Sequence, residues 1–286
     1  MRGKMALTSA LDYGTFTEAI IETVKQNHAW HRVVSIDLET KIEKKTDFLT
    51  GERLLGIGLS RRAGSEVETR TLRLKDESDD AEIELLYEAA RYLAPIKPLV
   101  LLGYNIAGYD YPLLNMKLKW HDDMLRARMP EGQKAVFPRE YWGLKDALTR
   151  AYVLDMMHPL RYAIAEHDKT TAKYKSLADV VDHARFADVA LMRRKQLATG
   201  GGKTPDGSPS QPGSSKAQPD SGNPALPEGG IAPALQAAHA KSATENKGKV
   251  IYEMWRTHDP NFERYLEGDV HDVLLLAEAL YGIGKP

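Results

Sequence analysis

The chain contains no cysteine among its 286 residues. This absence excludes disulfide bonds, zinc sites built from thiolates, iron–sulfur clusters and cysteine nucleophiles. An excess of one charge is also missing, because 39 lysines and arginines face 40 aspartates and glutamates, which gives a formal net charge of −1. Nucleic acid would therefore have to be held by local groups, since no global positive field attracts it.

Long apolar runs are absent as well. No stretch approaches the roughly 18 apolar residues that a membrane span requires, and the start of the chain, MRGKMALTSALDYG, has no apolar segment of signal-peptide length. Hydrophobic residues make up 42% of the chain and aromatic residues 8%, which is typical of globular proteins. These features predict a cytoplasmic protein with no membrane partner.

One segment differs in composition from the rest. Residues 199–230 are more than half glycine, proline and serine, and Leu226 is their only large apolar residue. Such a segment cannot bury enough apolar surface to offset the entropy lost on ordering. We therefore expect a flexible insert over residues 196–246, a candidate docking segment for a protein partner. The flanking parts, 1–195 and 247–286, are expected to form one domain.

Outside the insert, short apolar runs alternate with segments of helical periodicity. Strands are expected at residues 32–38, 53–59, 67–74, 99–102 and 152–156. Helices are expected at residues 15–28, 82–93, 111–118, 159–166, 177–184, 250–255 and 262–282. Three strands, a helix, a strand, further helices and a fifth strand predict an α/β fold with a mixed sheet covered by helices.

Carboxylates in three separate places carry the candidate chemistry. The first pair is Asp37 and Glu39, at the end of an apolar strand run. Because side chains alternate along a strand, both carboxylates point to one face and Leu38 to the other. A D-x-E pattern alone is expected about once by chance in such a chain. Its position at the end of a buried strand is what favours this pair.

The second place is LLGYNIAGYDYPLL, in which Asn105, Tyr109 and Asp110 follow a buried strand and precede a helix. This pattern would arise by chance about once in several tens of chains of this composition. Gly108 gives freedom to the strand-to-helix turn, and the helix N-terminus as well as a metal would favour Asp110 there. A simple N-cap role for Asp110 is the alternative.

The third place is RYLEGDVHDVLLL, within the last expected helix. Tyr265 and Asp269 are four residues apart and share one helix face, beside an apolar stripe. Asp272 is an alternative ligand, but its spacing from the tyrosine is less suitable. A Y-x3-D pattern is again expected about once by chance.

Taken in order, D-x-E, N-x3-Y-D and Y-x3-D resemble the three motifs of the DEDD superfamily of 3′–5′ exonucleases, in its tyrosine variant. The second motif most resembles that of the proofreading domains of family B DNA polymerases and their stand-alone relatives. The resemblance covers roughly residues 33–279 apart from the insert. The histidine variant would have histidine where Arg264 stands.

The resemblance implies a ribonuclease H-like fold and a set of site residues. Two Mg²⁺ or Mn²⁺ ions would be bound by Asp37, Glu39, Asp110 and Asp269. Tyr265 would complete the catalytic set by orienting the attacking water. The residues expected to contact the 3′-terminal nucleotide are Leu38, Thr40, Asn105 and Tyr109.

The implied activity is removal of nucleoside monophosphates from single-stranded or 3′-frayed DNA. A 3′–5′ exoribonuclease of the same superfamily stays open, because the residue that would sense a 2′-hydroxyl cannot be located. A catalytically silent nucleic-acid-binding module is a further alternative, which the intact set of four carboxylates disfavours. The nine histidines show no spacing of a zinc site and are expected to be surface or packing residues.

Limited proteolysis tests the expected insert. A nonspecific protease should cleave first within residues 196–246, because exposed segments rich in small residues are preferred sites, and should leave the flanking parts intact. Mass spectrometry of the fragments locates the first cut. Protection of the whole segment would contradict the interpretation.

Overall fold

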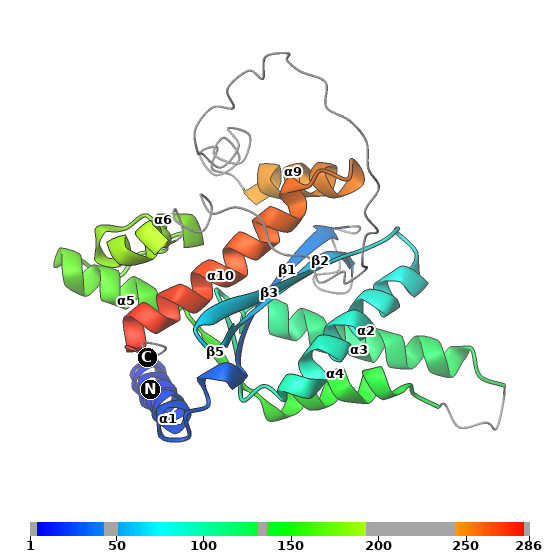
Figure 1. The fold of residues 1–286 in the computed structure, drawn as a ribbon, viewed down its shortest axis with the longest axis horizontal. Helices are drawn as coiled ribbons and strands as arrows, with labels where there is room; N and C mark the ends of the chain where they lie inside the picture. The colour runs from blue at the N-terminus through cyan, green and yellow to red at the C-terminus, as the bar shows by residue number, and fades with distance from the viewer. Residues whose placement is uncertain (1–4, 43–50, 131–135, 193–243, 283–286) are drawn as a thin grey trace, which may run out of the picture.

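A computed structural model describes residues 5–42, 51–130, 136–192 and 244–282 (Figure 1). Its centre is a five-stranded sheet in the order β3-β2-β1-β4-β5. The strands are β1 (Val33–Ile42), β2 (Glu52–Ala63), β3 (Glu66–Arg73), β4 (Val100–Gly103) and β5 (Tyr152–Asp155). β1, β2 and β3 pair antiparallel, whereas β4 runs parallel to β1 and β5 parallel to β4. The sheet is therefore mixed, and the predicted α/β fold with a ribonuclease H-like mixed sheet flanked by helices is confirmed.

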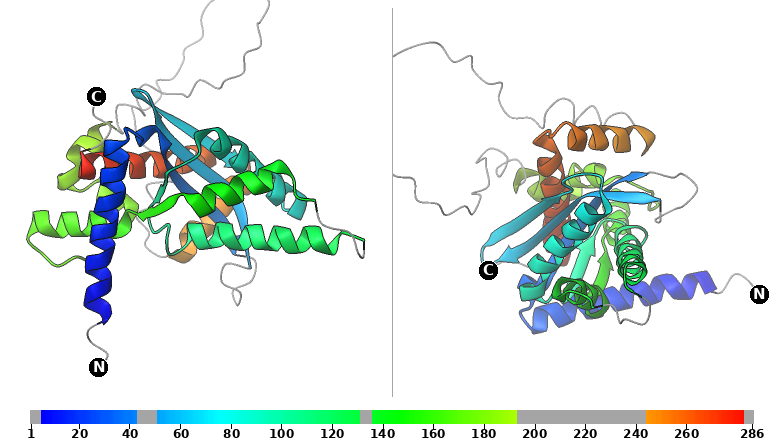
Figure 2. Two further views of the ribbon diagram at one scale, coloured as in Figure 1. Left: turned by 90° about the horizontal axis from the view of Figure 1, so that it is seen from below. Right: turned by 90° about the vertical axis from the view of Figure 1, so that its right-hand side faces the viewer.

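Helices cover both faces of this sheet (Figures 1 and 2). One face carries α2 (Asp79–Ile96), α3 (Asp110–Ala127) and α4 (Arg139–Arg150), and the other is crossed by α10 (Asn261–Tyr281). The remaining helices are α1 (Met5–Gln26), α5 (Met157–Asp168), α6 (Leu177–Val181) and α9 (Thr244–Arg256), with short 3₁₀ turns η1 (Trp30–Arg32) and η2 (Ala184–Phe186). Within the described ranges, no helix combines the length and the apolar character that crossing a membrane requires.

The five predicted strands are all present, and the prediction missed one α-helix among the described residues. α4 has buried residues Tyr141, Leu144, Ala147 and Leu148 at helical spacing, a signal that was available in the sequence. Gly143 and a predominantly polar composition weaken that signal, because glycine lowers helix propensity. The predicted helix at 177–184 ends at Val181, and a separate 3₁₀ turn begins at Ala184. The insert predicted at 196–246 lies, up to residue 243, outside the described residues and stays a prediction.

Two hydrophobic clusters form the core, and α10 belongs to both. The first joins β1, β2, α2, α3 and α4 to the beginning of α10, including Phe262 and Leu266. The second joins α1, β4, α5 and the region around α6 to the later part of α10, including Val273 and Leu276. α10 therefore connects the two halves of the core, together with β1 and β4, which also have residues in both clusters.

The close approach of α10 to the sheet depends on two glycines of β2. A Cβ atom at Gly58 would lie 2.9 Å from Val270 Cγ1 and 3.0 Å from the carbonyl oxygen of Leu266. At Gly56, a Cβ would lie 2.7 Å from Leu266 Cδ1 and 2.8 Å from Phe262 Cζ. These distances are shorter than van der Waals contact, so a side chain at Gly58 would press on the backbone of α10, and one at Gly56 would displace the side chains of Leu266 and Phe262.

Replacement of Gly58 by alanine tests this contact. Gly58→Ala should lower the free energy of unfolding by about 1–3 kcal/mol, because the added methyl group overpacks the contact with the α10 backbone. The matched control is Gly143→Ala, whose Cβ would meet Ala94 Cβ at an ordinary 3.9 Å. In the interior of α4 that change should stabilise by about 0.5–1 kcal/mol. Urea unfolding measures both, and equal effects would contradict the packing argument.

Candidate functional site

The sheet brings the first pair of carboxylates to its centre. Asp37 and Glu39 lie on β1, the middle strand, and their partners across the β1–β2 ladder are Gly58 and Gly56. Cross-strand partners share one face of the sheet, so both carboxylates stand beside positions without side chains. The same glycines admit α10, and the helix consequently lies next to the two carboxylates.

The helix contributes a third carboxylate to this group. One carboxylate oxygen each from Asp37, Glu39 and Asp269 lies within 4.8 Å of the others. Oxygen donors at this separation form a set that could hold a divalent cation, since hard cations prefer carboxylate ligands. We call these three residues the carboxylate group.

Asp110, the fourth predicted ligand, lies beside the carboxylate group without being part of it. It is the first residue of α3 and is buried, and its Oδ1 accepts a hydrogen bond of 3.0 Å from the backbone N–H of Leu38. Its negative charge helps to raise the pKa of Asp37. The residue before it, Tyr109, is the N-cap of α3, so the alternative N-cap role for Asp110 does not describe its position.

Burial and mutual repulsion raise the pKa of three of these carboxyls, Asp37, Glu39 and Asp110, in the absence of a cation. Burial raises the pKa of Asp37 well above its usual range, and the charges of Asp110, Asp269 and Glu39 add to the shift. The pKa of Glu39 is raised to about 7, mainly by burial, which Lys247 opposes and Asp269 reinforces. Burial also raises the pKa of Asp110 against the hydrogen bond from Leu38. A cation that offsets the negative charges would therefore stabilise the ionised carboxylates.

Tyr265 lies one helical turn before Asp269 and is 6% exposed. Burial raises the pKa of its phenol well above the ordinary value, and the charges of Asp269, Glu39 and Asp37 raise it further. The hydroxyl therefore stays protonated at neutral pH, and it hydrogen-bonds to the carboxylates of Asp269 and Glu39.

Lys247 is a member of the site that the sequence did not indicate. Its ammonium lies 3.7 Å from Glu39 Oε1 and 5.0 Å from the centre of the Tyr265 ring. Burial acts to lower the pKa of Lys247, but the carboxylates of Glu39, Asp269 and Asp37 outweigh it and raise that pKa. A lone lysine that follows a glycine- and proline-rich segment has no local pattern that could have marked it.

Two of the predicted nucleotide contacts share a buried acidic partner. The hydroxyl of Tyr109 donates to Glu52 Oε2, and Thr40 Oγ1 donates to the same oxygen at 2.9 Å. The two hydroxyls are themselves 2.6 Å apart. Glu52 begins β2 and is 5% exposed, and it was not anticipated from the sequence. The three side chains fix the start of α3 against β1 and β2.

Asn105 and Leu38, the other two predicted nucleotide contacts, differ in exposure. Asn105 is exposed and has a positive φ of 67°, a conformation that asparagine tolerates better than most residues. Leu38 is 5% exposed and packs into the first hydrophobic cluster. Its backbone faces Asp110, whereas its side chain points away from the carboxylate group.

A buried aspartate at the end of β5 holds the loop that carries Asn105. Asp155 accepts hydrogen bonds from the backbone N–H groups of Asn105 at 3.0 Å, Ala107 at 3.2 Å and Met157 at 2.9 Å. It therefore fixes the β4–α3 loop and the start of α5 together.

Comparisons with known proteins give little additional guidance. No protein-family model matches the chain, and no curated protein matches it. Among solved structures it is similar to the family B DNA polymerase from the hyperthermophilic archaeon Pyrobaculum calidifontis, with 16% sequence identity and a TM-score of 0.44. The similarity covers 87% of this chain and 24% of the polymerase chain, so this chain spans about a quarter of that protein. Similarity of this size identifies neither a family nor an activity.

The raised carboxyl pKa values predict an unusual dependence of stability on pH. Between pH 4.5 and about 7, the folded metal-free protein holds a proton on Glu39 that the unfolded chain has released. The free energy of unfolding should therefore fall by about 1–3 kcal/mol as pH rises through this window. Urea unfolding in EDTA measures the decrease.

Glu39→Gln should reduce this pH dependence, because one carboxyl with a raised pKa is removed while Asp37 and Asp110 remain. Glu267→Gln, at an exposed position of the same helix as Asp269, serves as the control and should retain the wild-type profile. Identical profiles for the wild type and Glu39→Gln would disprove the assignment.

Proposed function

We propose that this chain is a metal-dependent 3′–5′ exonuclease that releases nucleoside monophosphates from single-stranded or 3′-frayed DNA. The observation that carries the proposal is the convergence of Asp37, Glu39 and Asp269 within 4.8 Å, from a strand and a helix far apart in the sequence. The order of the D-x-E, N-x3-Y-D and Y-x3-D motifs supports the tyrosine variant of the DEDD superfamily.

In this proposal two Mg²⁺ or Mn²⁺ ions are held by Asp37, Glu39, Asp110 and Asp269. The residues fit such ions because they supply oxygen donors, and because burial leaves their negative charges in need of a positive partner. When bound, the ions would activate a water molecule and stabilise the charge that develops on the phosphate and the leaving oxygen. Asp110 can keep the hydrogen bond from the Leu38 N–H at Oδ1 and offer its second oxygen to an ion.

Tyr265 has the role of positioning the attacking water. Its phenol stays protonated beside the carboxylates, so the hydroxyl can donate a hydrogen bond to the water or to a phosphate oxygen. Lys247 has a supporting role at Glu39, where a fixed positive charge limits repulsion among the carboxylates before the ions arrive.

The predicted nucleotide contacts enter the proposal in different ways. Asn105 is exposed next to the start of α3 and can meet the terminal nucleotide with its amide. Thr40 and Tyr109 are tied to Glu52 through their hydroxyls, so they would contact the nucleotide with their carbon surfaces. The side chain of Leu38 is buried, so this residue would contribute through its backbone N–H, which holds Asp110.

A nuclease assay with single substitutions tests the proposal. With Mg²⁺ or Mn²⁺, the wild type should shorten a 5′-labelled single strand from its 3′ end, and EDTA should stop the reaction. Asp37→Asn and Asp269→Asn should each lower the rate by about 10³-fold or more, because each removes a charged ligand. Glu267→Gln, two residues from Asp269 but exposed, should retain wild-type activity.

Matched DNA and RNA strands in the same assay decide the substrate. Faster shortening of DNA supports the proposal as stated, whereas faster shortening of RNA would assign the chain to exoribonucleases. Binding of either strand with no shortening in the presence of both ions would revive the silent module. Wild-type activity in Asp37→Asn would refute a catalytic role for the carboxylate group.

A further inference from the structure

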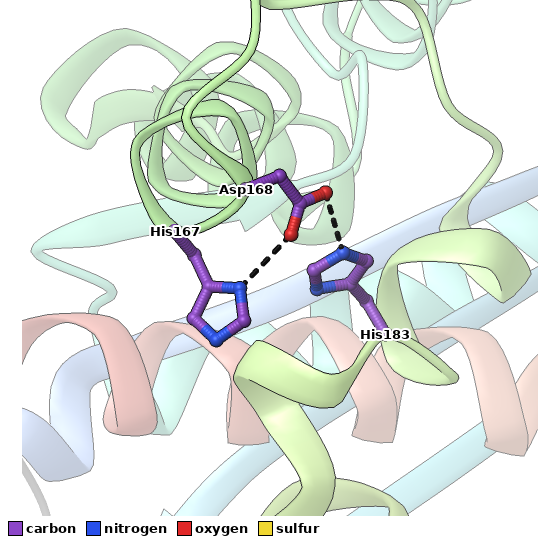
Figure 3. A group of neighbouring side chains, drawn as sticks. All are labelled: His167, Asp168 and His183. Atoms are coloured by element: carbon purple, nitrogen blue, oxygen red, sulfur yellow. Dashed lines mark hydrogen bonds and ion pairs between the residues drawn. The ribbon is translucent and has the colours of Figure 1, made fainter.

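A second group of potential metal ligands lies at the end of α5. His167 and Asp168 are the last two residues of that helix, and His183 follows α6 and immediately precedes η2. Asp168 Oδ1 lies 2.9 Å from His167 Nδ1, and Asp168 Oδ2 lies 3.0 Å from His183 Nε2. Figure 3 shows the two rings on either side of the carboxylate, each with a nitrogen directed at it.

We propose that His167, Asp168 and His183, the His–Asp–His site, bind a transition-metal ion of the zinc class. One ligand atom from each residue lies within 4.8 Å of the others. Ligand atoms around a tetrahedral Zn²⁺ are about 3.3 Å apart, given metal–ligand bonds of about 2.0–2.1 Å. In the metal-free protein the two nitrogens lie 2.9 and 3.0 Å from different oxygens of Asp168, so the side chains would rotate to bring one oxygen and both nitrogens around the ion.

The donor set separates this site from the carboxylate group. Imidazole nitrogen suits Zn²⁺ and its neighbours in the first transition series, whereas Mg²⁺ and Mn²⁺ favour oxygen ligands. The chain has no cysteine, so no thiolate site competes for such an ion. The three side chains range from 14% to 46% exposed, which leaves the site open for an ion to enter and for water to complete the coordination.

In the metal-free protein, a ring proton of His183 lies where the ion would bind. The backbone N–H of Arg185 donates to His183 Nδ1 at 3.1 Å, so the proton of that ring lies on Nε2 and points to Asp168. An ion at Nε2 displaces this proton, and the neutral ring then carries its proton on Nδ1. The Arg185 amide must turn away from Nδ1 in that state, which costs one hydrogen bond in the exposed η2 turn.

Binding of the ion would link the end of α5 to the segment after α6, and both regions pack against α10. Buried residues of α5, including Leu160, and of the region around α6, including Val181 and Phe186, pack in the second hydrophobic cluster with the later part of α10. A metal bridge from the end of α5 to His183 would close the segment between them. This arrangement makes a structural role, separate from hydrolysis at the carboxylate group, the expected one.

Zinc titration of the full chain tests the site, with saturating Mg²⁺ present to fill the carboxylate group. Isothermal calorimetry should report one zinc ion for the wild type and for Asp37→Asn. His167→Ala and His183→Ala should each weaken zinc binding at least about tenfold, because each removes one of three ligands. His158→Ala, an exposed histidine on the same helix, is the matched control and should bind as the wild type does.

Thermal unfolding provides a readout that is independent of nuclease activity. Zinc at a hundredfold excess over its Kd should raise the Tm of the wild type and of His158→Ala on the order of 5 °C. The two site variants should show no such rise. Co²⁺ as a probe should give a visible absorption band with nitrogen coordination that the site variants lack.

The proposal fails if the Asp37→Asn protein binds no zinc up to millimolar concentration. It also fails if the stoichiometry and affinity for zinc are unchanged in His167→Ala. His167 is the more exposed of the two histidines, so its replacement leaves the fold least affected, and circular dichroism without metal checks this point for both variants. None of these outcomes depends on whether the chain is a nuclease.

Discussion

The contact between α10 and the glycines of β2 determines the geometry of the whole site. Gly56 and Gly58 stand opposite Glu39 and Asp37 in the ladder, and the same two positions receive the side chains and backbone of α10. The absence of side chains at these two glycines therefore has two effects. It leaves room around Asp37 and Glu39, and it lets α10 bring Asp269 close to them. The requirement for close packing in the core and the requirement for converging ligands are met by one pair of residues.

Convergence of the carboxylates has a cost in stability. Four acidic groups lie together in or beside a buried region, and at Asp37, Glu39 and Asp110 burial and repulsion oppose ionisation. The fold limits this cost in two ways, through the ammonium of Lys247 at Glu39 and the backbone N–H of Leu38 at Asp110. Neither compensates fully, because the pKa values of Asp37, Glu39 and Asp110 stay raised. Local destabilisation of this kind is typical of sites that are completed by a ligand.

Features with a local signal could be predicted from the sequence, and features made by long-range contacts could not. The five strands were predicted from apolar runs, whereas Asp37, Glu39 and Asp269 were proposed from the order of three motifs, each of which lies within one short stretch of sequence. Glu52 and Lys247 act through hydrogen bonds or ion pairs with residues far away in the chain, and no spacing rule detects them. The two histidines around Asp168 are separated by α6, so they match no zinc pattern although the fold brings them together.

The membership of α10 in both hydrophobic clusters has a consequence for synthesis of the chain. Residues 261–281 follow every described strand in the sequence, so the ribosome makes the sheet before the helix that covers it. Until then, the face that carries Gly56, Gly58 and the paired carboxylates is open to solvent and to other nascent chains. Domains form as their segments emerge, and exposed apolar sheet surface is prone to aggregation. A chaperone that holds this face during translation would act at the stage when the protein is most vulnerable.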